Sequence, residues 1–583
     1  MNSRSIWIVF FSVALAAAFA WGCESSSRTA PGDDDDDTST DSDSDSDTDS
    51  DTDSDTDGDS DTDPENDCDF YAANNEPGSV GCEFVIPTPP FYNNDSPTSS
   101  YRGPCFAVMV ANDSDGPVQL TLSRGGTTLD AHAHTRIPTG LGSTLSYDPV
   151  PPGGIPPHEV AILFLSHRPG AESVFGGSLE CPVTPALTVD TAVTATEQGV
   201  AFELESDVPI SLYDIIPYGG AQSYLPSASL LYPSTAWGTN YLTLAPHDGI
   251  LQRWMLFVAR DDNTNVDLLT YATVTSSSTV AIPAPGVNTT YTLNRGEYIQ
   301  LNSTTESFSG TILDSDNPIG VYTGDTYLQV PTQDCSGGPR DSAHQQIPHI
   351  KALGSEYIGA GIPTRLASLL NESVAYRLTG VVDGTQLTWA PSTPTGAPTS
   401  LTAGAVVEFE TRDFFIVESQ DDDHPFSLTQ YMSGDISSCI GGCFDGGWSC
   451  QPGGQGDTDW IQLVPPAQFF NQYSFFTDPT YGITSISLVR VAGDTGFADV
   501  EVECMGVVSG WQSIGTSGVY EVAHVELYRG GVDDVYNCAT SQHSATSDEP
   551  FGLVVWGTYR DASYGYSAGG GATEINDVEV PIE

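Results

Sequence analysis

Apolar and polar residues alternate with a period of two along most of the chain beyond residue 80. The alternation is clear at residues 118–122, 200–204 and 500–502. It places every second side chain in a core and the next in solvent, as in half-buried β-strands. The chain also holds 58 glycines and 40 prolines, which separate these runs, and no long helical stripe interrupts them. The pattern therefore predicts an all-β fold.

A short turn-forming motif occurs four times along the chain. It reads Ser or Asp, then Asp, any residue, Pro and an apolar residue, and its prolines lie 109, 107 and 125 residues apart. This spacing matches one β-sandwich domain and is too long for a solenoid repeat. Ser and Asp bond their own backbone in turns, and Pro is tolerated at the first residue of a strand, so each copy predicts a turn that enters a strand. The copies are residues 206–210, 315–319, 422–426 and 547–551.

A second motif precedes three of these four turns. A large apolar residue is followed four positions later by tyrosine, and 77, 68 and 77 residues separate that tyrosine from the next motif proline. Two motifs in the same order predict tandem β-sandwich-like modules. The copies are residues 237–241, 353–357 and 469–473. We expect modules at 68–218, 225–330, 341–434 and 459–573, a Cys- and Gly-rich insertion at 435–458, and a C-terminal tail at 574–583.

The first 22 residues have the pattern of an export signal. Arg4 is followed by an apolar run at 6–20 that is too short to be a transmembrane helix. Gly22 before Cys23 resembles the cleavage site of bacterial lipoproteins, which predicts a lipidated Cys23 and attachment to the outer membrane or cell surface through the N-terminal lipid alone. Trp21 and the missing leucine depart from that motif, so ordinary signal cleavage is the alternative.

Residues 23–67 are expected to form a disordered acidic spacer. Residues 33–63 hold 17 aspartates, and they hold no apolar residue. Such a segment has no core to offset its chain entropy, and like-charge repulsion extends it. Weak calcium binding is an alternative role because the aspartates offer closely spaced oxygen ligands. No other cofactor is expected.

The net charge of the chain is −61, and Lys351 is its only lysine. A strongly acidic chain repels phosphate backbones and anionic lipid surfaces, so we expect no nucleic-acid partner. The expected partner is an extracellular protein or glycan whose identity the sequence leaves open.

Ten cysteines remain besides Cys23, and an even number in an exported chain predicts disulfides. The expected local pairs are Cys68–Cys82, Cys105–Cys181 and Cys504–Cys538. Cys335 is expected to join one of Cys439, Cys443 and Cys450, leaving the other two for each other. Zinc is the alternative for the last three, although their spacing matches no common zinc motif.

Several motifs together resemble a known family. The chain carries Asn294-Arg295-Gly296-Glu297, a hairpin with Asp383-Gly384-Thr385, and the ending Ser563-Tyr564-Gly565-Tyr566-Ser567-Ala568-Gly569. With the two repeats, these motifs resemble the N-terminal domain of IgG Fc-binding protein over about residues 195–573, although Ser567 stands where the family usually has Pro. The resemblance implies binding of immunoglobulin Fc in the animal protein. For a bacterial lipoprotein it implies an extracellular β-rich binding domain, and it transfers no site residue.

The sequence carries no Gly-x-Ser-x-Gly, His-Glu-x-x-His or phosphate-loop motif. The best candidate for ligand binding is the insertion, where Phe444 and Trp448 lie among glycines and cysteines, because aromatic residues dominate binding hot spots. The favoured function is therefore a surface-displayed, non-enzymatic binding or adhesion protein. The alternative is a secreted hydrolase acting on polysaccharide or protein, which would need one cleft that holds converging acids with shifted pKa values.

Overall fold

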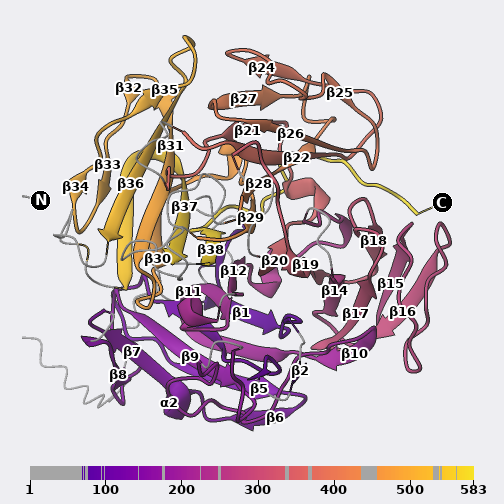
Figure 1. The fold of residues 1–583 in the computed structure, drawn as a ribbon, viewed down its shortest axis with the longest axis vertical. Helices are drawn as coiled ribbons and strands as arrows, with labels where there is room; N and C mark the ends of the chain where they lie inside the picture. The colour runs from indigo at the N-terminus through magenta and orange to yellow at the C-terminus, as the bar shows by residue number, and fades with distance from the viewer. Residues whose placement is uncertain are drawn as a thin grey trace, which may run out of the picture. The chain divides into compact units, whose positions relative to one another are not determined.

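The computed structural model describes most of the chain from residue 68 to residue 582. The described residues are 68–69, 71, 77–92, 95–96, 99–141, 144–173, 177–223, 225–246, 251–334, 340–365, 371–434, 456–529, 538, 541–559 and 561–582. Within them the chain is almost entirely β-structure, as predicted (Figure 1). The expected signal peptide and the whole of the expected spacer lie outside these residues.

The first module is built on one nine-stranded antiparallel sheet. The order β6-β5-β11-β4-β9-β7-β8 forms its path, and β1 and β12 pair with β11 as well. The central strand β11 is 15 residues long, and β4 beside it and β9 on the far side of β4 are fully buried. The strands are β1 (Val80–Ile86), β4 (Phe106–Ala111), β5 (Leu120–Arg124), β6 (Thr127–Leu129), β7 (Thr135–Thr139), β8 (Ser146–Pro149), β9 (Val160–Ser166), β11 (Phe202–Ile216) and β12 (Ser227–Leu231), with a separate hairpin of β2 (Asp95–Ser96) and β3 (Ser99–Ser100) and the short helix α2 (Ala131–His134).

The second module is a β-sandwich. A five-stranded sheet of order β10-β17-β14-β19-β20 and a four-stranded sheet of order β13-β18-β15-β16 supply its apolar core, which includes Phe257, Leu268 and Leu301. The strands are β10 (Glu197–Val200), β13 (Asn240–Leu242), β14 (Arg253–Ala259), β15 (Thr264–Leu269), β16 (Thr289–Leu293), β17 (Glu297–Ser303), β18 (Ile312–Ser315), β19 (Ile319–Leu328) and β20 (Asp341–Ile347).

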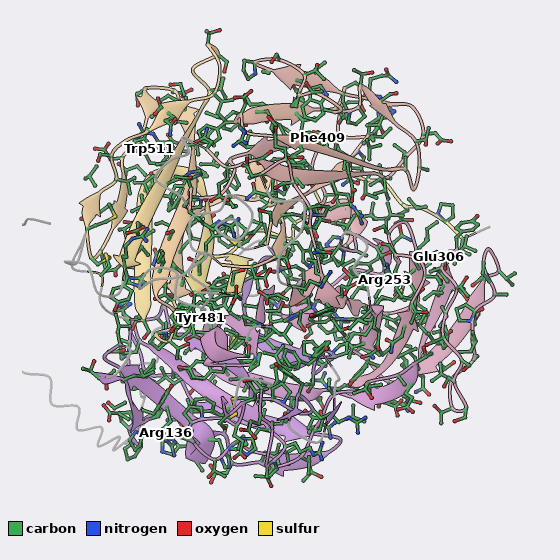
Figure 2. The ribbon with its side chains drawn as sticks, in the orientation of Figure 1. Arg136, Arg253, Glu306, Phe409, Tyr481 and Trp511 are labelled. Atoms are coloured by element: carbon green, nitrogen blue, oxygen red, sulfur yellow. A yellow bond between two sulfur atoms is a disulfide. The ribbon has the colours of Figure 1, made fainter. Side chains whose placement is uncertain are left out.

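The third module is also formed by facing sheets. They have the orders β21-β27-β24 and β26-β22-β28-β29, with a short β23-β25 pair beside them. Phe409, labelled in Figure 2, packs in this core against Tyr376, Trp389 and Phe415. The strands are β21 (Glu356–Gly359), β22 (Val374–Gly380), β23 (Thr385–Gln386), β24 (Thr388–Ala390), β25 (Ser400–Leu401), β26 (Val406–Thr411), β27 (Phe415–Glu418), β28 (Phe426–Met432) and β29 (Asp459–Gln462).

The fourth module has a nine-stranded sheet of order β34-β33-β37-β31-β36-β35, with β30 and β38 on β37 and β32 on β31. Its strand β37 spans 18 residues and carries most of the pairing. The strands are β30 (Phe470–Phe476), β31 (Ile483–Gly493), β32 (Gly496–Phe497), β33 (Val500–Val502), β34 (Gly506–Val507), β35 (Gln512–Ser513), β36 (Tyr520–Arg529), β37 (Gln542–Tyr559) and β38 (Ala562–Ser567).

Strand pairing divides the chain differently from the ranges expected from sequence. β12, β20 and β29 lie at the expected starts of new modules, yet each pairs with the long strand before it, namely β11, β19 and β28. The strand β10 precedes β11 in the chain but pairs with β17 of the second module. Each of the first three modules therefore ends one strand later than expected, and the first two are joined by an exchanged strand.

The repeated Asp-x-Pro motif marks the place where the chain changes sheets. In the second and third modules, Pro318 and Pro425 stand between a strand of one sheet and the next strand in the facing sheet. In the first and fourth modules, Pro209 and Pro550 lie inside β11 and β37, next to a shift in pairing register. A bend or bulge at such a corner is the usual way for one strand to serve two sheets.

The repeated tyrosine locks this corner. The Tyr241 hydroxyl accepts a hydrogen bond from the Gly238 N–H at 3.1 Å and donates one to the Ile319 carbonyl at 2.7 Å. Tyr473 repeats both bonds with the N–H of Phe470 and the carbonyl of Phe551. Trp237, the first residue of the tyrosine motif, covers the corner. Its ring packs so closely on Gly320 that a Cβ at this glycine would lie 2.6 Å from the ring. The two sequence motifs therefore act together, since the Asp-x-Pro motif forms the corner and the tyrosine motif holds it in place.

The C-terminal tail lies along the second module. The Asn576 amide donates to the carbonyls of Ile350 and Leu353, both at 2.9 Å, and the backbone of Val580 exchanges two hydrogen bonds with the Asn240 side chain. Val578 and Val580 pack against the core of that module. No helix among the described residues is long and apolar enough to cross a membrane.

Tyr241→Phe should lower the free energy of unfolding by about 2 kcal/mol, because it leaves the partly buried N–H of Gly238 and the buried carbonyl of Ile319 without their partner. Urea unfolding followed by tryptophan fluorescence would measure this change. Tyr271→Phe is the matched control, since Tyr271 is 72% exposed. Equal stability of the two variants would show that the tyrosine does not lock the corner.

Candidate functional site

The last strands of the four modules meet at one buried seam. The Gln345 side chain of β20 directs its Nε2 at the carbonyls of Ala228 in β12, Trp460 in β29 and Gly565 in β38, at 3.0, 3.1 and 3.4 Å. Figure 1 shows β12, β20, β29 and β38 close together among the four modules. Gln345 is 5% exposed, so these bonds are shielded from water and join all four modules through one amide.

A hydrogen-bonded Ser–His–Asp group lies in the same seam. His344 places Nδ1 2.8 Å from the Ser227 hydroxyl and Nε2 2.8 Å from Asp214 Oδ1. This is the connectivity of a nucleophile, a base and an orienting acid. However, the three residues are at most 1% exposed, and Ser227 Oγ also accepts the backbone N–H of His344 at 2.9 Å. A substrate cannot reach this hydroxyl, and the group joins β11, β12 and β20 as a structural link.

The carboxyl groups whose pKa values burial raises most lie in the interior. Burial raises the pKa of Asp341 well above its usual range, and the neighbouring Asp457 carboxylate raises it further. Burial also raises the pKa of Asp113 and of Asp478 to about 6. Tyr481, labelled in Figure 2, is buried beside these acids, and its own pKa is raised by burial and then by Asp478. These acids do not line an accessible cleft of the kind that a hydrolase needs.

A cavity bordered by described residues lies between the third and fourth modules. Its volume is about 260 Å³. Arg365 and Asn371 border it from the third module, and Gln512, His524 and Glu526 border it from β35 and β36 of the fourth. Met432, Ile483 and Trp556 supply an apolar part of the wall. A concave site between modules that combines apolar and polar groups is the usual form of a ligand site.

The arginines in the described part of this wall are each paired with a glutamate. The Arg365 guanidinium donates to Glu372 Oε2 through Nε at 3.0 Å and Nη2 at 2.8 Å, and its Nη1 donates to the Ser433 carbonyl at 3.0 Å. Arg529 forms a second ion pair with Glu526. The wall therefore carries little net charge, although the chain as a whole is strongly acidic.

His524 is the one histidine among the described residues of the wall, and it is neutral near pH 7. Its Nε2 lies 2.8 Å from the Ala360 carbonyl, which can only accept, so Nε2 carries the proton. Burial lowers the pKa of His524 to about 4. The Nδ1 atom of this neutral imidazole is consequently a hydrogen-bond acceptor.

The described ends of the 435–458 insertion stand at this cavity. Ser433 bonds Arg365, and a Cβ on Gly456 would lie 2.9 Å from Thr558 and 3.3 Å from both Arg365 and Met432. Phe444 and Trp448, the aromatic residues proposed from sequence, lie outside the described residues. So do Cys439, Cys443 and Cys450, the partners expected for Cys335, and Cys335 itself. Nothing in the sequence marked the cavity wall, because its residues are scattered from 363 to 558.

Three disulfides are present among the described residues. Cys68–Cys82, Cys105–Cys181 and Cys504–Cys538 close loops with sequence separations of 14, 76 and 34 residues. They match the three local pairs expected from sequence. Cross-links of this size stabilise the fold chiefly by restricting the unfolded chain.

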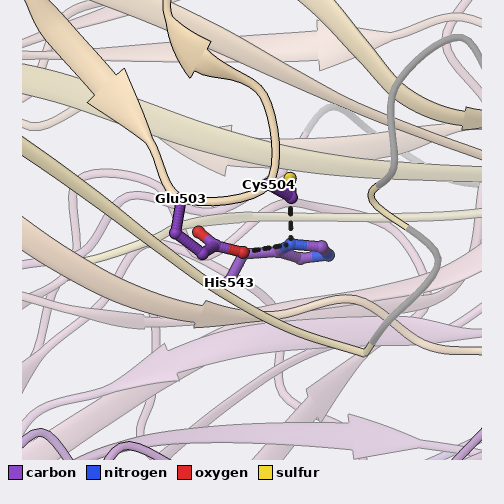
Figure 3. Close-up of side chains that lie close together, drawn as sticks. All are labelled: Glu503, Cys504 and His543. Carbon is purple, nitrogen blue, oxygen red and sulfur yellow. Dashed lines mark hydrogen bonds and ion pairs between the residues drawn. The ribbon is translucent and has the colours of Figure 1, made fainter. Parts of the chain in front are cut away.

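Glu503, Cys504 and His543 form a cluster that resembles a metal site (Figure 3). His543 Nδ1 lies 3.1 Å from Glu503 Oε1 and 3.7 Å from Cys504 Sγ. A metal binds a cysteine as the free thiolate, and here the sulfur is bonded to Cys538. Because His543 is 1% exposed, the cluster acts as packing around the disulfide.

Comparison with known proteins identifies the family. A family model described as IgGFc binding protein matches residues 227–557, which is more than half of the chain. The chain belongs to the IgGFc binding protein family. This confirms the resemblance found in the sequence. No curated protein and no solved structure matches the chain.

The IgGFc binding match begins at β12 and ends inside β37. It therefore covers the second module apart from β10, the third module, most of the fourth, and the seam strands β12, β20 and β29. Nearly the whole wall of the inter-module cavity is also inside the match, and only Thr558 falls one residue beyond it. The sheet of the first module, apart from β12, precedes the matched region.

Asp478→Asn should flatten the dependence of stability on pH. The pKa of Asp478 is about 6 in the folded protein and about 4 in the unfolded chain. The contribution of Asp478 to the free energy of unfolding is therefore fully present below pH 4. It is lost as pH rises through 6, and the loss is about 3 kcal/mol. Urea unfolding at pH 4.5 and 7.5 would measure it. The exposed control Asp548→Asn should keep the wild-type slope, and an unchanged slope in Asp478→Asn would refute this assignment.

Proposed function

We propose that this protein is a lipid-anchored, extracellular binding or adhesion protein that captures its ligand without chemical turnover. The observation that carries the proposal is the match to the IgGFc binding protein family over residues 227–557. The name of that family refers to binding, and in this chain we extend it to an extracellular protein or glycan ligand, with immunoglobulin Fc as one candidate.

The arrangement of polar groups supports binding without turnover. The Ser227–His344–Asp214 group is buried, and so are Asp341 and Asp478, whose pKa values burial raises. A secreted hydrolase, the alternative, could not use these groups, because a substrate cannot contact them. The cavity between the third and fourth modules instead offers paired charges and a neutral histidine, which suits recognition better than bond cleavage.

The attachment proposed for the protein rests on the sequence of its N-terminus. Cleavage after Gly22 and lipidation of Cys23 would hold the chain at the outer membrane or cell surface. The acidic residues up to 67 would then act as a spacer between the lipid and the modules.

Cys23→Ser should release the protein from the membrane fraction into the medium or the soluble fraction, because the only proposed anchor is removed. Fractionation followed by immunoblotting of the full-length protein would measure this. The control Cys68→Ser removes a cysteine from a disulfide and should leave membrane attachment unchanged. Equal membrane retention of Cys23→Ser and wild type would reject the lipoprotein assignment.

Full-length protein should bind at least one member of a panel of immunoglobulin Fc, mucin-type glycoprotein and polysaccharide, measured by biolayer interferometry. It should not degrade any of them over hours. Replacing Phe444 and Trp448 together by alanine should weaken binding at least tenfold with little change in melting temperature, since buried aromatic anchors dominate binding energy. Cleavage of a panel member that disappears in Ser227→Ala would instead establish the hydrolase.

A further inference from the structure

We propose that the cavity between the third and fourth modules binds a single neutral sugar residue of a glycan. This inference rests on the proposed binding function and names the chemistry of its ligand. The walls come from β28, β31, β35, β36 and β37 and from the segment that follows β21.

The size of the cavity limits the ligand to one small ring. Its volume of about 260 Å³ is below the roughly 300–1,000 Å³ of sites that enclose drug-sized molecules. A peptide segment or a protein loop would need a longer groove. A terminal sugar ring can enter such a cavity while the rest of the glycan remains outside.

The charge balance of the wall favours a neutral ligand. Arg365 is paired with Glu372, and Arg529 is paired with Glu526. An anionic sugar would need an unpaired cation and would also approach a protein of net charge −61. A cationic ligand would need an unpaired carboxylate in the wall, whereas the wall carboxylate Glu526 already has its arginine.

The polar groups of the wall match a ligand with several hydroxyl groups. Gln512 is exposed on the edge strand β35, and its amide bonds no other described residue, so it offers one acceptor and two donors. His524 adds an acceptor at Nδ1, and the Glu526–Arg529 pair presents carboxylate and guanidinium atoms side by side. Each sugar hydroxyl both donates and accepts, so a wall with mixed donors and acceptors suits adjacent hydroxyls.

The apolar residues of the wall present little surface to a ligand. Met432 and Trp556 are 1% exposed and Ile483 is 6% exposed. Recognition of a sugar at this cavity would therefore rest on hydrogen bonds to its hydroxyl groups.

The test compares Gln512→Trp, which places a bulky ring at the cavity, with the matched control Gln198→Trp. Gln198 is also an exposed glutamine on an edge strand, β10, and it does not border the cavity. The probe is full-length protein binding to a mucin-type glycoprotein, with and without enzymatic removal of its glycans. We expect Gln512→Trp to lower affinity at least tenfold and Gln198→Trp to change it less than twofold. Neutral monosaccharides should compete, and carboxylated sugars should not.

The outcomes separate this inference from the proposed function. Equal binding of the glycan-free glycoprotein, or unchanged affinity in Gln512→Trp, would overturn the sugar site and leave the binding function standing. Stronger competition by a carboxylated sugar would also overturn it. Failure of the wild type to bind any panel member would overturn both. If Gln512→Trp has a lowered melting temperature, the smaller change Gln512→Ala should still weaken binding severalfold.

Discussion

One buried amide holds the centre of this protein together. Gln345 Nε2 is directed at backbone carbonyls of the first, third and fourth modules while its own strand belongs to the second. A carbonyl that loses such a partner in the interior cannot turn to water, so each bond is expensive to break. The last strands of the four modules, β12, β20, β29 and β38, must therefore stay in fixed positions relative to one another. The Asp-x-Pro corners that precede them in the chain must keep their geometry as well.

The tyrosine-locked corners explain how separate modules can meet that requirement. In the second and third modules the chain leaves one sheet at the Asp-x-Pro motif and enters the facing sheet, and the strand after it pairs with the seam strand. An error at the corner would shift that pairing by a residue and turn every side chain to the opposite face. A buried hydroxyl that accepts one hydrogen bond and donates another, as at Tyr241 of the second module and Tyr473 of the fourth, fixes the corner where the shift would begin.

The sequence was sufficient for features with a local or repeated signal. Period-two alternation indicated the β-fold, the two motifs indicated the modules, and the nearest cysteines indicated three disulfides. The ranges expected from sequence ended each of the first three modules one strand early. Ser227–Leu231, for example, follows a turn-rich stretch and so resembled the first strand of a new module, and only its pairing with β11 shows that it belongs to the first sheet. The cavity was not predictable, since residues such as Arg365 and Gln512 come together only when two modules pack.

The buried Ser227–His344–Asp214 group shows why bonding pattern alone does not define an active site. Its distances would suit a nucleophile, yet the serine hydroxyl also accepts the backbone N–H of His344, and its strand lies at the seam. Opening this group to a substrate would break the contact between the first and second modules. The cavity between the third and fourth modules, where we propose the sugar site, is bordered by Gln512 on an edge strand, so a ligand there would leave the seam intact. The polar residues at the two places differ accordingly: those of the seam are buried and hold the modules together, whereas Gln512 at the cavity is exposed.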